Sequence, residues 1–243
     1  MKKVICFDLD GTLTESKTVI TSEMAELLAK LQKIKKVVII GGASFSQFQK
    51  QFTSHLNYFD NLYIMPTCGA AFFKYENNKW TPIYQLHLSP VEKKKIYEAF
   101  DQAFVDIDYH NPELTYGQII ENRDTEISFS TLGQEAPLST RKSLKYDRRP
   151  EIITRLKIYI PEFSIALSGT NTIDVTRYGI DKGYAIEQLG EYFDVSIGDM
   201  VFVGDAIYEG RNDYAVVRTG IDTVLVSGPA DTQRFIKSLL VLP

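Results

Sequence analysis

The chain has only two cysteines, Cys6 and Cys68, among its 243 residues. Cys6 lies in a short apolar segment, so we expect two reduced thiols rather than a disulfide. Long hydrophobic runs are also scarce, and the apolar segment that ends at Phe7 is too short for a signal peptide or a membrane span. We therefore expect a cytoplasmic protein that has no membrane partner.

Clustered positive charge is scarce as well. The 27 Lys and Arg residues are outnumbered by 31 Asp and Glu residues, and the net charge is −4. A nucleic-acid surface needs Lys and Arg gathered on one face, and the lysines at 93–95 fit an exposed helix face better. We therefore expect no nucleic-acid partner.

The apolar residues that are present follow a strand–helix alternation at both ends of the chain. Short buried strands are predicted at 3–7, 37–40, 62–65 and 200–203, with helices after most of them. This alternation is typical of a parallel sheet with right-handed crossovers. The sequence therefore predicts an α/β protein with a Rossmann-like parallel-sheet core.

The pattern changes in the middle of the chain. A helix that begins at Ser89-Pro90 is followed by predicted antiparallel strands, a helix near 150–160 and two further strands. We interpret residues 84–178 as an inserted α+β cap, which divides the core into a first part at 1–83 and a second part at 179–243.

Two aspartates follow the first predicted strand. Asp8 and Asp10 stand in the segment Asp-Leu-Asp-Gly-Thr, where Gly11 lets the backbone turn. One such carboxylate can act as a nucleophile while the other transfers a proton. The pair therefore predicts nucleophilic catalysis at this strand end, although Asp-Gly is also common in ordinary turns.

Groups suited to phosphate and metal binding follow at other strand ends. Gly42 and Ser44 precede a helix whose N-terminal amides can hold phosphate oxygens, and Lys182 offers a point charge at the start of another helix. Asp205 and Asp213 carry hard oxygen ligands that suit Mg²⁺. Open α/β sheets place their sites at the carboxyl ends of parallel strands, where all these residues are predicted to lie.

Taken in order, these segments resemble the haloacid dehalogenase superfamily of phosphatases and phosphomutases, and the cap resembles its class IIB. The resemblance covers the whole chain. It implies that Asp8 forms an aspartyl phosphate and that Asp10 acts as acid and base. It also implies Mg²⁺ as the cofactor. The metal ligands would be Asp8, the backbone carbonyl of Asp10, and Asp205, with Asp213 in support.

The four motifs of the superfamily correspond here to residues 8–12, 41–44, 181–183 and 204–213. Within that superfamily, the fourth motif and the order of the cap residues are similar to those of eukaryotic-type phosphomannomutases. This resemblance implies that Arg123 and Arg141 bind a distal phosphate. It also implies that Thr172 and Asp174 contact sugar hydroxyls. The forked guanidinium of arginine suits phosphate oxygens.

The chain departs from the mutase pattern at three places. Gln134 replaces a phosphate-binding arginine, Lys17 stands where an arginine is usual, and the second motif reads Gly-Gly-Ala-Ser. A mutase must bind a bisphosphate, so loss of a distal cation should impair it more than a phosphatase.

We therefore predict a phosphatase that acts on a small phosphorylated metabolite, with a hexose phosphate as the expected substrate. A phosphomannomutase-type isomerase is the alternative, and a non-catalytic ligand-binding protein is a remote one. The oligomeric state is left open, with a homodimer through the cap as one alternative.

Overall fold

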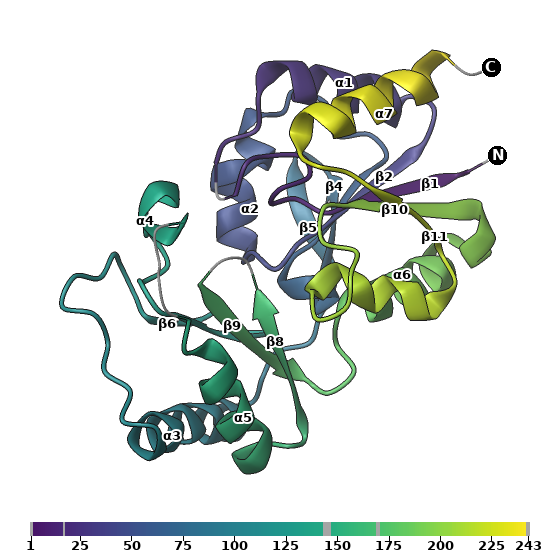
Figure 1. The fold of residues 1–243 in the computed structure, drawn as a ribbon. Helices are drawn as coiled ribbons and strands as arrows, with labels where there is room; N and C mark the ends of the chain where they lie inside the picture. Colours follow the sequence, from purple (N-terminus) through teal and green to yellow (C-terminus); the bar gives the residue numbers. More distant parts are fainter. Residues whose placement is uncertain (1, 17, 143–146, 169–170, 242–243) are drawn as a thin grey trace. The chain divides into compact units, whose positions relative to one another are not determined.

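The computed structural model describes residues 2–16, 18–142, 147–168 and 171–241. The chain divides into a core unit and a cap unit that is inserted into it (Figure 1). The core unit comprises Met1–Gln85 and Asp181–Pro243, and the cap unit comprises Leu86–Ile180. The expected cap limits, 84 and 178, each lie two residues before those of this division.

The core unit is built around a seven-stranded sheet in the order β11-β10-β1-β2-β3-β4-β5. The first five strands are parallel, and β4 and β5 form an antiparallel hairpin at one edge. The interior strand β1 pairs with β10 and β2, so the carboxyl ends of these three strands are neighbours. The strands are Val4–Phe7 (β1), Lys36–Ile40 (β2), Leu62–Met65 (β3), Ala71–Glu76 (β4), Lys79–Gln85 (β5), Met200–Gly204 (β10) and Asp222–Leu225 (β11).

Helices cover both faces of this sheet. Successive β1 residues point to opposite faces, so Ile5 and Phe7 join one apolar core while Val4 and Cys6 join the other. The first core is covered by α1, α2 and α7, and the second by α6 (Figure 1). These helices are Ser22–Gln32 (α1), Phe45–Gln51 (α2), Lys182–Phe193 (α6) and Pro229–Val241 (α7).

Two helices differ from the sequence-based expectation. The helical spacing of Phe45, Phe48, Phe52 and Leu56 predicts one helix that continues through Phe52. In the structure the φ of −130° at Phe52 ends α2, and a 3-10 turn at Thr53–His55 follows. Phe52 still packs in the apolar core. The apolar residues that predicted one helix are therefore packed against this core by α2 and the 3-10 turn together. Similarly, the helix expected across 213–218 is a 3-10 helix, η4, at Asn212–Thr219.

The cap unit contains a four-stranded antiparallel sheet in the order β6-β7-β9-β8. Its longest helix, α3, begins as predicted at Ser89-Pro90, where Ser89 and Glu92 form a capping box. A short helix, α4, lies within 133–150, a stretch whose charges and prolines predict a loop. The bounds are Pro90–Asp106 (α3), Ile120–Asn122 (β6), Ile127–Ser130 (β7), Leu138–Lys142 (α4), Arg149–Tyr159 (α5), Phe163–Ser168 (β8) and Thr172–Arg177 (β9).

The two faces of the cap sheet differ in chemistry. One face carries apolar residues such as Ile127 and Phe129, which share an apolar core with residues of α3 and α5. The alternate residues of β7 and β9 are polar and yet buried. They are Ser128, Ser130, Thr172, Asp174 and Thr176.

The predicted fold class is confirmed: an α/β protein whose Rossmann-like, largely parallel core sheet is interrupted by an α+β cap. Cys6 is fully buried and Cys68 is partly buried, and neither forms a disulfide with another described residue. Within the described ranges, no helix combines the length and the apolar character that crossing a membrane requires.

Candidate active site

A tight loop follows β1 at the carboxyl edge of the core sheet. The N–H of Asp8 donates to the carbonyl of Val203 in β10 (2.9 Å), which holds Asp8 beside that strand. The chain then reverses, and the N–H groups of Leu13 and Thr14 both donate to the carbonyl of Leu9, each at 3.0 Å. The first motif is therefore a rigid turn rather than a loose loop.

Gly11 allows this turn to lie against the loop that follows β10. Its φ is +90°, in the region that favours glycine, and a Cβ atom there would lie 2.6 Å from Oδ2 of Asp205. Next to it, Oγ1 of Thr12 donates to Oδ1 of Asp205 at 3.3 Å. The first and fourth motifs thus form one structure.

Three aspartates gather at this point. Carboxylate oxygens of Asp8, Asp205 and Asp213 all lie within 4.8 Å of one another. Oδ2 of Asp213 accepts a hydrogen bond from the N–H of Ala206 at 3.2 Å, and a Cβ atom on Gly204 would lie 2.4 Å from this oxygen. A cluster of hard oxygen ligands of this kind could bind a divalent metal ion.

Lys182 is the cation among these carboxylates. Its side chain is fully buried, and Nζ donates to Oδ1 of Asp8 and to Oδ1 of Asp213. Lys182 is the first residue of α6, and Oδ1 of the N-cap residue Asp181 accepts from the N–H of Tyr184 at 3.0 Å. The start of α6 therefore fixes the lysine between the first and fourth motifs.

Gly183 lets α6 approach the segment that carries Asp213. A Cβ atom at this position would lie 2.5 Å from the carbonyl oxygen of Ala215 in η4. A larger residue would push the two segments apart and separate Lys182 from Asp213.

Burial and mutual repulsion dominate the electrostatics of the site. Burial raises the pKa of Asp8 well above its usual range, Lys182 lowers it, and Asp213 raises it again. Burial also raises the pKa of Asp205, with a further contribution from the charge of Asp213. For Lys182, burial lowers the pKa, but the charges of Asp213 and Asp8 outweigh this and raise it above its ordinary value. The three carboxylates carry more negative charge than Lys182 neutralises, so the site can accommodate further positive charge.

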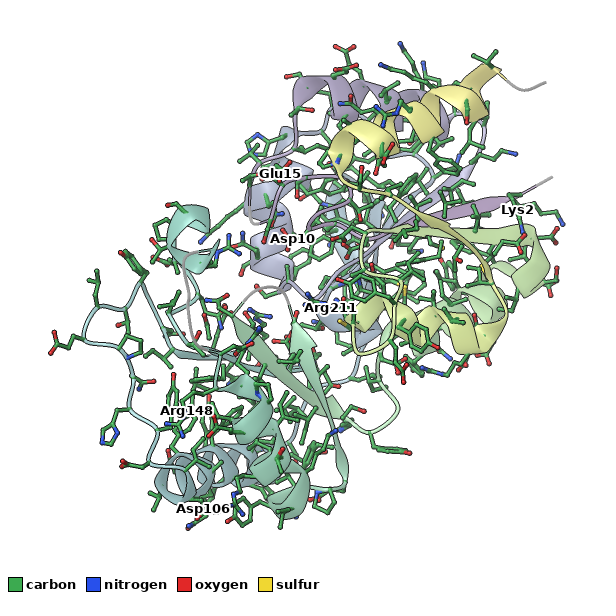
Figure 2. All side chains as sticks on the ribbon, in the orientation of Figure 1. Lys2, Asp10, Glu15, Asp106, Arg148 and Arg211 are labelled. Carbon is green, nitrogen blue, oxygen red and sulfur yellow. The ribbon has the colours of Figure 1, made fainter. Side chains whose placement is uncertain are left out.

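Asp10 is held by a residue that sequence reasoning missed. Nε2 of Gln51 donates to Oδ1 of Asp10 and to Oγ1 of Thr14, both at 2.8 Å. Gln51 is the buried last residue of α2, and Oε1 accepts from Nε2 of Gln47 at 3.3 Å. Figure 2 labels Asp10 within the core unit. Gln51 therefore fixes the orientation of the predicted acid–base carboxylate.

Gln51→Leu should lower kcat by roughly tenfold with little change in KM, because Asp10 would lose its orientation but keep its chemistry. Gln49→Leu, on the exposed face of the same helix, is the matched control. Steady-state kinetics of both variants check this expectation. Equal kcat values for the two variants would show that Gln51 has no positioning role.

Gly42 and Ser44 follow β2, which is the parallel neighbour of β1. Ser44 is the N-cap of α2, and its Oγ accepts from the N–H of Gln47 at 3.3 Å. Oγ of Ser44 also lies 3.0 Å from Oγ of Ser46. The second motif thus follows a strand adjacent to β1, and its predicted phosphate-binding role stays a prediction.

The cap residues form a separate polar group. Nε of Arg123 donates to Oε2 of Glu121 (2.6 Å), and Nη1 donates to Oε1 of Glu126 (2.8 Å). Nη2 donates to Oε1 of Gln134 at 3.1 Å, and Nη1 lies 3.8 Å from Oδ1 of Asp174. The structure therefore brings Arg123 and Asp174 together, along with two glutamates that sequence reasoning did not select.

The other predicted cap residues have different neighbours. Thr172 lies in β9, and its carbonyl accepts from Nη1 of Arg149 at 3.1 Å. Nε of Arg141 donates to the carbonyl of Ala136 at 3.1 Å. Lys17 lies outside the described residues. The roles assigned to Thr172 and Arg141 by resemblance stay predictions.

A sequence model of haloacid dehalogenase-like hydrolases matches residues 5–218. Phosphomannomutase 1 of Dictyostelium discoideum is 29% identical, with 97% of this chain and 96% of that protein covered. A phosphomannomutase of Arabidopsis thaliana is 25% identical, with 98% and 96% covered. The similarity therefore includes both the core and the cap.

Solved structures show the same fold. A C-terminally truncated IMP-nucleotidase of Plasmodium falciparum has a TM-score of 0.74 and 18% identity, with 98% of this chain and 71% of that chain covered. The C-terminal domain of the trehalose-6-phosphate phosphatase of C. albicans has a TM-score of 0.69 and 13% identity, with 100% and 93% covered.

Proposed function

Because this chain belongs to the haloacid dehalogenase-like hydrolases, we propose that it is a magnesium-dependent phosphatase that removes phosphate from a small sugar phosphate, a hexose phosphate being the expected substrate. Phosphoryl transfer is common to this proposal and to the mutases that the chain resembles. The two reactions differ in what receives the phosphoryl group, which is water in a phosphatase and a sugar hydroxyl in a mutase.

The geometry around Asp8 supports a two-step transfer. One carboxylate oxygen, Oδ1, is engaged by Lys182, and the second is proposed to attack phosphorus as the bond to the sugar oxygen breaks. Asp10 donates a proton to the leaving oxygen and then takes a proton from water. That water attacks phosphorus, the bond to Asp8 breaks, and inorganic phosphate leaves while both aspartates return to their starting states.

Mg²⁺ fits the carboxylate cluster. Asp8, Asp205 and Asp213 present three carboxylates close together, and Lys182 is the one cation that the described residues place among them. We propose that these carboxylates and the backbone carbonyl of Asp10 hold the ion. When bound, it supplies positive charge that offsets the repulsion between an anionic nucleophile and an anionic phosphate.

The state of Arg123 is the observation that favours hydrolysis over isomerisation. A mutase must bind a second phosphate, which needs unmatched positive charge. The Arg123 guanidinium is instead matched by Glu121 and Glu126, and Gln134 accepts a hydrogen bond from it without adding positive charge. Phosphomannomutase activity stays the alternative, because the relatives reported above carry that name.

The products formed by the wild-type protein separate the two activities. We expect inorganic phosphate to appear faster than any isomerised sugar when mannose and glucose phosphates, as 1- and 6-phosphates, are supplied with Mg²⁺. Addition of a hexose bisphosphate should not reverse this order. Isomerisation that outpaces phosphate release would establish the mutase alternative instead.

Metal removal should abolish activity, and Mg²⁺ should restore it. Metal binding should also raise the melting temperature of the chelator-treated protein, since an ion that binds only the folded state stabilises it. Asp205→Asn should weaken this thermal shift, whereas Asp222→Asn, whose side chain is 71% exposed, should not. Full activity in excess chelator would contradict the metal role.

A homodimer through the cap stays a prediction. The mass of the protein in solution, measured by light scattering, tests it: a monomer at micromolar concentration would argue against it.

A further inference from the structure

The polar face of the cap sheet carries a buried group that we call the cap acidic cluster. It consists of side chains from β6, β7, β9 and the segments that adjoin them. Its members are Glu121, Arg123, Glu126, Ser128, Gln134 and Asp174.

One cation serves three carboxylates in this cluster. Arg123 pairs with Glu121 and Glu126 through different guanidinium nitrogens and lies 3.8 Å from Asp174. Glu126 and Asp174 each form an ion pair with Arg123, and with no other cation among the described cap residues. With every group ionised, three negative charges and one positive charge leave the cluster at −2.

Two carboxylate oxygens in the cluster have no hydrogen-bond partner. Oδ1 of Asp174 accepts from Oγ of Ser128 at 2.6 Å, but Oδ2 has no partner within the described part of the chain. Oε1 of Glu126 accepts from Arg123, and Oε2 likewise has none. The side chain of Glu126 is 0% exposed and that of Asp174 is 5% exposed, so both oxygens are shielded from bulk solvent.

Both oxygens belong to one side of the sheet. Ser128 pairs with Asp174 in the β7–β9 register, and Glu126 precedes Ser128 by two residues, which places it on the same face. Buried carboxylate oxygens are normally paired, because leaving them unmatched costs free energy. The arrangement is thus complementary to a group that donates hydrogen bonds and carries positive charge.

We propose that the cap acidic cluster binds a positively charged amino group of the substrate, and that Glu126 is the residue that determines this specificity. The inference rests on the proposed phosphatase function and deepens it: the substrate class becomes an amino sugar phosphate. An ammonium group can donate to the free oxygens of Glu126 and Asp174 while it offsets their charge. A neutral hydroxyl would leave the charge unmatched, and a second phosphate would add to it.

Without ligand, the raised pKa of Glu126 favours a bound proton in place of this cation. Burial raises the pKa of Glu126 well above its usual range, the charge of Asp174 raises it further, and Arg123 opposes both. Glu121 also pairs with this arginine. Binding of an ammonium group should therefore displace the proton of Glu126 into solution.

The test measures binding to the Asp8→Asn protein, in which turnover should be too slow to interfere. Glucosamine 6-phosphate and glucose 6-phosphate, and the two matching 1-phosphates, are titrated by calorimetry at neutral pH in two buffers of different ionisation enthalpy. We expect the amino sugar to bind at least about tenfold more tightly than its neutral counterpart, and to release protons as it binds.

Glu126→Gln, which keeps the shape of the side chain, should remove both the preference and the proton release. Asp174→Asn should weaken the preference, and it provides a second reading if Glu126→Gln does not fold. Asp108→Asn is the matched control, because it removes an equal charge from a cap side chain that is 94% exposed. This control should bind both ligands as the Asp8→Asn protein does.

Equal affinity for amino and neutral sugar phosphates overturns the inference, as does an unchanged preference in both Glu126→Gln and Asp174→Asn. Failure of the amino sugar to bind overturns it too. These outcomes are distinct from failure of the phosphatase proposal, which the products of the wild-type protein decide. If the protein prefers amino sugar phosphates but isomerises them, the inference about the cap stands and the phosphatase proposal is rejected.

Discussion

Asp8→Asn should lower kcat by roughly 10⁴-fold or more while the fold stays intact. The amide fills the same space, but it lacks the anionic oxygen that must bond to phosphorus. Because burial raises the pKa of Asp8, the substitution removes a charge that is costly to bury, and Lys182 keeps its bond to Asp213. The melting temperature should therefore stay close to that of the wild type.

Steady-state phosphate release and circular dichroism together check this expectation. Asp222→Asn is the matched control, because its exposed side chain pairs with Lys2 at the surface of the same unit. It should keep wild-type activity. An Asp8→Asn protein that retains a tenth of the wild-type rate would rule out Asp8 as the nucleophile.

Lys182→Met should have the largest effect on stability. It leaves Asp8 and Asp213 buried and close together with no cation, and breaking a buried charge pair in this way typically costs about 3–5 kcal/mol. Activity should be lost as well, because Lys182 helps to offset the charge of the nucleophile and the phosphate. Chemical denaturation of the metal-free protein measures the first effect.

The loss of stability in Lys182→Met should depend on pH. Asp8 already has a raised pKa in the folded protein, and removal of Lys182 would raise it further. Between the ordinary Asp value of about 3.9 and this raised pKa, the folded state binds more protons than the unfolded state. The free energy of unfolding of the variant should therefore fall as pH rises through this window, relative to the wild type.

Lys30→Met, on the exposed surface of α1, is the control for the loss of a lysine. It should unfold at nearly the wild-type denaturant concentration at every pH. A Lys182→Met protein as stable as this control would mean that the two carboxylates find compensation elsewhere.

The arrangement of the candidate active site could largely be predicted because its residues lie next to strand ends. Asp8 follows β1 and Asp205 follows β10, and these strands are parallel neighbours, so their carboxyl ends must meet. The position of Lys182 is also determined by local sequence, because it is the first residue of the helix that Asp181 caps. In each case a short stretch of sequence determines where the side chain lies.

Gln51 could not be predicted in the same way. Its contact with Asp10 spans 41 residues, so it depends on how α2 packs against the loop that follows β1 and not on the local sequence. The apolar spacing indicates which face of the segment is buried, but not which polar group a glutamine on that face will contact. No sequence motif marks the glutamine.

The cap shows a different limit. The resemblance predicts Arg123 as a ligand for a distal phosphate, and this stays a prediction; what the structure adds is that Glu121 and Glu126 pair with the arginine. Strand alternation could have placed Glu126 on the polar face, two residues before Ser128. What alternation cannot show is that the segment at 121–126 turns back, so that Arg123 pairs with both glutamates.

Rapid quenching of a single turnover tests the central claim most directly. The substrate is a sugar phosphate that the wild-type protein turns over, with a radiolabel in its phosphoryl group. We predict that label appears first on the peptide that contains Asp8 and then only in inorganic phosphate. Turnover without label on that peptide would contradict the covalent route, and label that passes from the peptide into a sugar phosphate would contradict hydrolysis.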